Sequence, residues 1–129
     1  MKILLILACF WAVLPCFGQI SSNNVDKITS AIYKIEGGTK TKYPFGIKSI
    51  NTEGNYDKSR QICRNTIVNN IKRYQNQTNY TNYFIFLADR YCPPSADKQG
   101  NINWKKNIQS VLGQEFVEKF NKELTKEKM

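Results

Sequence analysis

The sequence predicts a mainly α protein of the α+β class, with a helical domain that carries a small β-hairpin lobe after its first helix. Three observations predict this class. Apolar residues recur at three- and four-residue steps in several segments, which is the spacing of amphipathic helices. One segment between the first two helices instead alternates apolar and polar residues and is rich in Gly and Pro. No internal repeat is found, so we expect a single domain over residues 19–129.

The first 18 residues are typical of a secretory signal peptide. A short basic start precedes the apolar run Ile3 to Leu14, and small Gly18 offers a cleavage point. The run is too short to cross a hydrocarbon core of roughly 30 Å. We therefore expect a secreted or periplasmic protein with no integral membrane segment after signal cleavage.

The chain is strongly basic, with 19 Lys and Arg against 10 Asp and Glu and a formal net charge of +9. A basic domain is attracted to anionic partners such as the cell envelope, although an excess of Lys that only solvates the surface is an equal alternative. Nucleic acid is not expected as a partner, because the aromatic residues follow apolar helical faces and do not interleave with Lys and Arg. We expect a monomer.

The sequence contains no His, and this absence excludes several chemistries. Ser-His and Cys-His nucleophile pairs both need an imidazole. Cys63 and Cys92 alone do not fill a tetrahedral metal shell, so we expect no metal and no cofactor. In an exported protein this pair instead predicts a disulfide, which would stabilise the fold by about 3–4 kcal/mol in the chain-entropy account.

The first helix is expected to begin with Ser21 or Ser22 as its N-cap and to end at Gly37-Gly38. Its apolar face is formed by Val25, Ile28, Ala31, Ile32 and Ile35. From Thr39 to Asn55 the pattern changes to apolar residues at every second position, with Pro and Gly as breakers, which predicts the hairpin lobe. The alternating residues are Tyr43, Phe45 and Ile47, and the breakers are Pro44, Gly46 and Gly54.

Four further segments follow the lobe. A second helix is expected from about Asp57 to Tyr74, and a heavily apolar helix from Asn82 to Tyr91 should lie in the centre of the domain. We expect a loop from Cys92 to Asn101, because paired prolines and Gly100 do not continue a helix. Two last helices are predicted around Trp104 to Leu112 and Phe116 to Leu124.

Glu36 is the strongest candidate for chemistry. It stands at the last turn of an apolar helix, in Ile32-Tyr-Lys-Ile-Glu36-Gly-Gly38. The C-terminal end of a helix carries partial negative charge, which disfavours an ionised carboxylate. Apolar surroundings would keep this group protonated near neutrality, as a general acid that protonates a glycosidic oxygen requires.

These residues resemble the lysozyme-like superfamily, whose members place a catalytic Glu at a helix end just before a β-lobe. The stretch Tyr43-Pro-Phe-Gly-Ile47 is similar to the start of that lobe. Phe86-Leu-Ala-Asp-Arg-Tyr91 and Asn103-Trp-Lys-Lys-Asn107 are similar to the closing segment of small phage and bacterial transglycosylase-like proteins. The likeness spans Ser22 to Leu112, although the Gly-Leu-Met-Gln run that many soluble lytic transglycosylases carry after their Glu is absent, and Phe45-Gly46-Ile47 stands roughly at its place.

The resemblance implies a lysozyme or lytic transglycosylase that cuts the glycan strands of peptidoglycan with Glu36 as general acid and base. Glu53, inside the predicted lobe, is the candidate second carboxylate of a retaining mechanism. Without a second carboxylate, the transglycosylase route remains, in which one Glu acts twice. Tyr43, Gly46 and Tyr91 are the candidate substrate-binding residues, although a Tyr at such positions is more often a core residue.

The alternative hypothesis is a non-catalytic, secreted basic module. Such a module would bind cell-wall glycan or envelope polyanions with the same fold and the same positive charge. The sequence alone leaves both hypotheses open.

Overall fold

The computed structural model describes residues 20–48 and 50–128, and the predicted signal peptide lies outside these residues. Its elements are the helices α1 (Ser22–Ile35), α2 (Tyr56–Gln75), α3 (Tyr83–Tyr91), α4 (Lys98–Leu112) and α5 (Gln114–Lys128), with a short 3-10 helix η2 (Gly38–Lys40). The predicted mainly α class is confirmed. Within the described residues, no helix combines the length and the apolar character that crossing a membrane needs.

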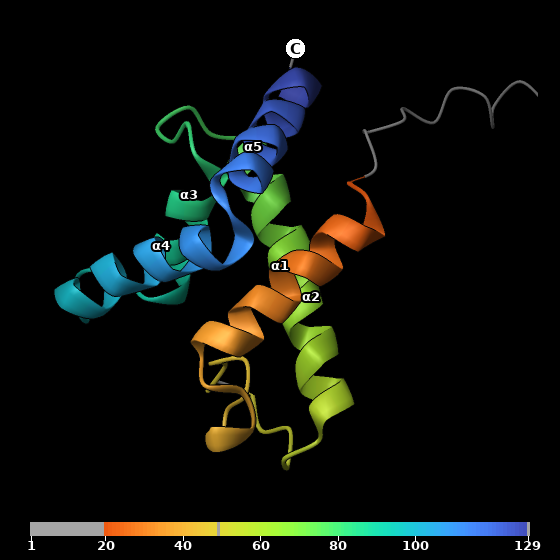
Figure 1. Ribbon diagram of the computed structural model, residues 1–129, viewed down its shortest axis with the longest axis vertical. Helices are drawn as coiled ribbons and strands as arrows, with labels where there is room; N and C mark the ends of the chain where they lie inside the picture. The colour runs from red at the N-terminus through yellow and green to blue at the C-terminus, as the bar shows by residue number, and fades with distance from the viewer. Residues whose placement is uncertain (1–19, 49, 129) are drawn as a thin grey trace, which may run out of the picture.

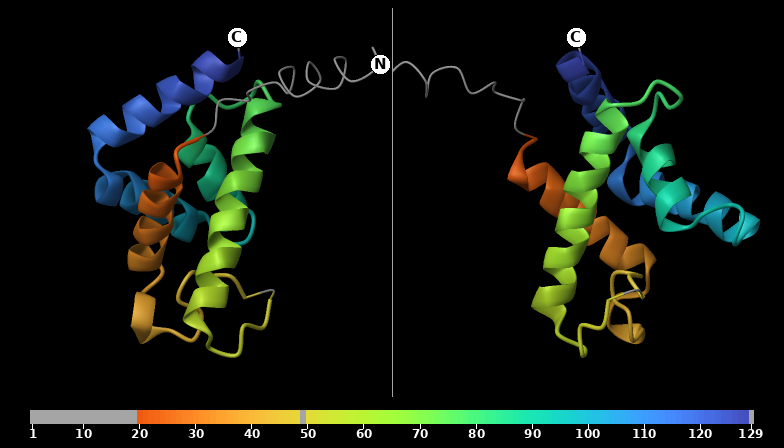
Figure 2. Two further views of the ribbon diagram at one scale, coloured as in Figure 1. Left: turned by 90° about the vertical axis from the view of Figure 1, so that its right-hand side faces the viewer. Right: turned by 180° about the vertical axis from the view of Figure 1, so that it is seen from behind.

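The helices are arranged around the crossing of α1 and α2 (Figure 1). The chain between Glu36 and Asn55 joins the lower ends of these two helices, and α5 lies at the opposite end of the molecule (Figure 2). Helices α3 and α4 pack against each other beside this pair, and α4 also packs on α1. We call the chain between α1 and α2 the lobe segment. The end of α1 lies between this segment and α4.

Polar side chains cap the N-termini of α1, α2 and α3, close to the positions expected from the sequence. Ser21 is the N-cap of α1 and accepts a hydrogen bond from the Asn23 N–H at 3.2 Å. Asn55 begins α2 and Asn82 begins α3 in the same way, each through its side-chain oxygen. Such caps satisfy backbone N–H groups that have no partner inside the helix.

Helix α4 begins earlier than expected, so the predicted loop from Cys92 to Asn101 is too long. Asp97 is its N-cap and accepts a hydrogen bond from the Gly100 N–H at 2.8 Å. A Cβ on Gly100 would collide with this carboxylate. Gly100 therefore makes room for the capping side chain at the start of the helix, where we expected a helix breaker.

The predicted β-hairpin lobe is wrong, because the described residues 36–48 and 50–55 contain no strand and form η2 followed by turns and bends. Tyr43 to Gly46 is a β-turn in which the Gly46 N–H donates to the Tyr43 carbonyl at 2.8 Å. Pro44 occupies the second position, where its fixed φ favours such a turn. The alternation of apolar residues comes from Phe45 pointing into the core, not from a pleated strand.

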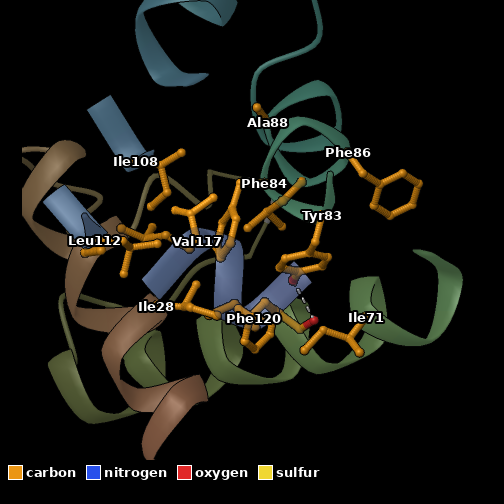
Figure 3. Packing of buried hydrophobic residues seen from close by; sticks show 14 of the residues in the cluster. Ile28, Ile71, Tyr83, Phe84, Phe86, Ala88, Ile108, Leu112, Val117 and Phe120 are labelled. Carbon is orange, nitrogen blue, oxygen red and sulfur yellow. Dashed lines mark hydrogen bonds between the residues drawn. The ribbon is translucent and has the colours of Figure 1, made fainter. Parts of the chain in front are cut away.

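Among the described residues, one continuous core includes side chains of α1, α2, α3, α4 and α5. Helix α3 contributes most to it for its length, as its apolar sequence predicted. Tyr83 and Phe84 are completely buried, and Figure 3 shows them pointing toward Phe120 and Val117 of α5. The Tyr83 hydroxyl donates to the Ile67 carbonyl at 3.1 Å, so its one polar atom is satisfied. Burial of such side chains contributes about 1.5–3 kcal/mol each.

A polar network joins the end of α3 to α4. Asp89 accepts hydrogen bonds from the Tyr80 hydroxyl at 2.7 Å and the Asn101 amide at 2.9 Å, and it forms an ion pair with Lys105 at 2.8 Å. Asn101 is buried and also donates to the Cys92 carbonyl at 2.8 Å. Burial alone would raise the pKa of Asp89, but Lys105, Tyr80 and Asn101 together lower it. This network fixes the register of α4 on α3.

We predict that Asp89→Asn lowers the free energy of unfolding by about 1–3 kcal/mol at neutral pH, because three partners lose a charged acceptor. The pKa of Asp89 is lowered in the folded state, so its contribution is fully present above the ordinary value of 3.8 and is lost as pH falls through the folded value. Urea unfolding at several pH values should show the difference shrinking in acid. Glu53→Gln, at an exposed position, is the control; an equal difference at all pH values would contradict the assignment.

Candidate active site

Glu36 marks the end of α1, where the sequence predicts it. Its N–H donates to the Ile32 carbonyl at 2.9 Å, which makes it the C-cap residue. Gly37 follows with a φ of 93°, a left-handed conformation that only glycine adopts without strain, and it ends the helix. The Glu36 side chain is half-buried between the lobe segment and α4.

Trp104 of α4 holds one oxygen of this carboxyl group. Its indole N–H donates to Glu36 Oε1 at 2.7 Å. The indole is 7% exposed, so the bond lies largely out of solvent. A buried indole N–H needs an acceptor, and Glu36 supplies one from a helix end far away in the sequence.

The ring of Tyr91 packs against the indole of Trp104. The two rings stack with their centroids 5.2 Å apart and an interplanar angle of 25°. The Tyr91 hydroxyl donates its one proton to the Phe45 carbonyl at 2.8 Å. The contact of 3.6 Å between this hydroxyl and Cys63 Sγ therefore has the thiol as donor. Burial raises the pKa of Tyr91 far above its ordinary value, with Cys63 and Glu36 adding to the effect, so the hydroxyl stays neutral.

Gly46 completes the surroundings of the carboxyl group. A Cβ at this position would lie 2.6 Å from Glu36 Cδ, 2.7 Å from Oε2 and 2.9 Å from Oε1. The backbone therefore approaches the carboxyl group so closely that no side chain fits between them. Gly46 also has a φ of 73°, which is strained for any other residue.

These contacts form a closed ring that we call the Glu36 cluster: Glu36, Phe45, Gly46, Tyr91 and Trp104. Each member touches the next, from the carboxyl group through the two stacked rings to the Phe45 carbonyl and back through Gly46. The cluster holds one carboxyl group in a fixed orientation, which is the arrangement that general acid–base chemistry needs. Within the described residues, no group of three His, Cys, Asp or Glu side chains is placed to hold a metal ion.

The other predicted site residues lie at different places. Tyr43 is half-buried in the turn before Gly46. Together with Thr52 and with Ser59 of α2, it lines a cavity of about 10 Å³, the size of one water molecule. Glu53 is exposed in a turn with a left-handed φ of 53°. No hydrogen bond or ion pair of the described residues links Glu53 to Glu36. The structure thus brings Gly46 and Tyr91 to the surroundings of Glu36, and it shows no hydrogen bond or ion pair between the described Glu53 and Glu36 side chains; their predicted roles stay predictions.

The predicted disulfide is not formed, because Cys63 and Cys92 are both free thiols. Cys63 is buried on α2, and Tyr91 occupies the position beside its sulfur. Cys92 is the C-cap residue of α3, with its N–H bonded to the Ala88 carbonyl. Burial raises the pKa of Cys63 to about 11, although the charge of Arg60 opposes this effect, and burial with the charge of Asp97 raises the pKa of Cys92.

The sequence alone does not pair Trp104 with Glu36. One signal was available, since the only other Trp of the chain, Trp11, lies in the predicted signal peptide. A Trp on the apolar face of a helix needs an acceptor for its N–H, and few acidic residues lie on apolar segments. That reasoning restricts the candidates, but only the packing of α4 on α1 identifies Glu36.

We predict that Gly46→Ala displaces the Glu36 carboxyl group, and Gly54→Ala is the matched control. Gly54 has a φ of 75°, close to that of Gly46, but its Cβ would meet nothing within 4 Å. Both substitutions should cost about 1–2 kcal/mol for the left-handed backbone. Gly46→Ala should cost an additional ~1–3 kcal/mol for the collision. Denaturant unfolding measures both values, and equal destabilisation would contradict the close approach.

We also predict that iodoacetamide at pH 8 alkylates Cys92 well before Cys63 in the native protein. With a pKa of about 11, only about one thousandth of Cys63 is thiolate at this pH, and the sulfur is buried. Peptide mass mapping measures both rates, and unfolding in urea should make them similar. A peptide in which Cys63 and Cys92 are cross-linked, found without reduction, would contradict the free thiols.

In comparisons with known proteins, no family model, no curated protein and no solved structure matches the chain.

Proposed function

We propose that the protein is a peptidoglycan-cleaving glycosidase, a lysozyme or lytic transglycosylase, that uses Glu36 as general acid and base. The observation that carries this proposal is the Glu36 carboxyl group at the end of α1, held through Oε1 by Trp104 and covered by the Gly46 backbone. A carboxyl group fixed in this way is prepared for proton transfer without reorganisation during the reaction. Export, expected from residues 1–18, would bring the enzyme to its substrate.

Within this class, the position of Glu53 supports the route that needs a single carboxyl group. A retaining glycosidase needs a second carboxylate about 5–5.5 Å away, and an inverting one about 6.5–9.5 Å away. Glu53 is exposed in its own turn, and none of the described contacts brings it to the Glu36 cluster. We therefore favour the lytic transglycosylase over the hydrolase.

The proposed reaction balances with Glu36 alone. The protonated carboxyl group gives its proton to the glycosidic oxygen as the bond from that oxygen to C1 of the sugar breaks. The C6 hydroxyl of the same sugar then bonds to C1, and its proton returns to the Glu36 carboxylate. The product is a 1,6-anhydro sugar end, and no water is consumed.

The second candidate function is a non-catalytic module that binds envelope polyanions, and the net charge of +9 favours it. Such binding depends on Lys and Arg and weakens with salt. It does not depend on the protonation of one half-buried carboxyl group. The two functions therefore respond differently to a substitution that removes only this proton.

We predict that Glu36→Gln lowers the rate of peptidoglycan cleavage by about 10²- to 10⁴-fold, because the amide cannot donate the proton to the leaving oxygen. Gln keeps the size of the side chain and an oxygen that can accept from Trp104. Mass spectrometry of digested peptidoglycan should show 1,6-anhydro ends with the parent protein, whereas reducing ends would support the hydrolase. Co-sedimentation with insoluble wall measures binding, which Glu36→Gln should retain.

Glu53→Gln is the matched control for this experiment, since it removes the carboxylate that the structure leaves in solvent. It should cleave like the parent protein. A loss as large as that of Glu36→Gln would restore the two-carboxylate mechanism. Wall binding without cleavage in the parent protein would overturn the enzyme and support the binding module.

A further inference from the structure

Trp104 makes the two oxygens of the Glu36 carboxyl group chemically different. An indole N–H can only donate a hydrogen bond, so Oε1 must accept at 2.7 Å whether the carboxyl group is charged or neutral. The hydroxyl oxygen of a protonated carboxyl group is a weaker acceptor than its carbonyl oxygen, so an acid proton on Oε1 would weaken the bond from the indole. The indole therefore favours the hydrogen of protonated Glu36 on Oε2 over Oε1.

The indole is held so that it cannot follow a rotating carboxyl group. Trp104 is largely buried and stacks on Tyr91. The Tyr91 hydroxyl is in turn bonded to the Phe45 carbonyl at 2.8 Å, next to Gly46 in the sequence. The donor that contacts Oε1 is thus anchored to the same turn that covers the carboxyl group.

Gly46 restricts the carboxyl group from a second direction. A Cβ there would lie at similar short distances from Cδ, Oε2 and Oε1, so the backbone covers a face of the group and not only one oxygen. Rotation about the terminal bond of Glu36 would move an oxygen toward Gly46 and break the bond to Trp104. Within the described residues, no hydrogen bond is made to Oε2.

We propose that Trp104 is a positioning residue that assigns the transferable proton of Glu36 to Oε2. This inference rests on the proposed function for its catalytic meaning, but the location of the proton is independent of it. Trp104 does not touch the reacting atoms. It acts through Glu36, by keeping one oxygen occupied and the acid hydrogen on the other.

The first test locates the proton without using activity. Infrared difference spectra between the parent protein and Glu36→Gln, recorded in acid, isolate the carbonyl stretch of protonated Glu36. In the parent protein this stretch should have the lower frequency of a hydrogen-bonded carbonyl, and in Trp104→Phe it should rise. Phe keeps an aromatic ring against Tyr91 and removes the donor, although its ring is smaller than the indole. An unchanged frequency in Trp104→Phe would overturn the proposal.

The second test measures the positioning effect on soluble, uncrosslinked glycan strands of peptidoglycan. Trp104→Phe should lower kcat by about 10- to 100-fold, because the acid hydrogen then occupies either oxygen and the group rotates. KM should change little, since Trp104 does not bind the strand. Asn107→Ala, at an exposed position on the same helix, is the control and should behave like the parent.

The outcomes separate this inference from the proposed function. If Glu36→Gln is inactive but Trp104→Phe keeps its kcat, the enzyme stands and the positioning role is wrong. If the loss in Trp104→Phe appears in KM alone, Trp104 binds substrate and the proposal is equally overturned. If the parent protein cleaves no glycan, the proposed function fails, and the infrared result still decides which oxygen carries the proton.

Discussion

The hydrogen bond from Trp104 to Glu36 is the constraint on which the arrangement of this protein depends. It connects α4 to the end of α1 across 68 residues of sequence, at the point where the chain leaves the first helix for the lobe. The bond exists only if α4 lies in one register. Asn101 and Lys105 set that register through their contacts with Asp89, one turn or less from Trp104. The network that stabilises the α3–α4 pair therefore also positions the donor of the candidate site.

Most of the helical architecture could be predicted from the sequence, because apolar periodicity and capping residues act locally. Ser21 and the apolar face of α1 define the first helix without reference to the rest of the chain. The lobe could not be predicted in this way. The alternation at Tyr43, Phe45 and Ile47 fits a β-strand, and it fits equally well a Pro-containing turn that buries one aromatic ring. The two structures differ in whether a partner strand is present, which the local sequence does not show. Gly100 shows the same limit, since a glycine ends a helix in one context and admits a capping carboxylate in another.

The candidate site was predicted in part, for the same physical reason. The position of Glu36 at a helix end is a local property, and the structure has it there. Its partners are not local: Trp104 comes from α4, Tyr91 from the end of α3 and Gly46 from the lobe turn. The disulfide was predicted from the number of cysteines and the expected compartment. Neither of these gives information about the distance between the two sulfur atoms in the fold. Packing decides that question, and it places the Tyr91 hydroxyl beside Cys63.

Tyr91 shows why the site and the core are not separate parts of this molecule. Its ring stacks on Trp104, and its hydroxyl donates a hydrogen bond to the Phe45 carbonyl. Its hydroxyl oxygen also accepts a hydrogen bond from the Cys63 thiol on α2. Each of these contacts is a packing or hydrogen-bonding interaction that would stabilise the fold if no site existed. Together they leave the Glu36 carboxyl group with one occupied oxygen and one covered face. A carboxyl group at a helix end in solvent would rotate freely, so the chemical distinction between Oε1 and Oε2 is produced by the interior of the protein and not by Glu36 itself.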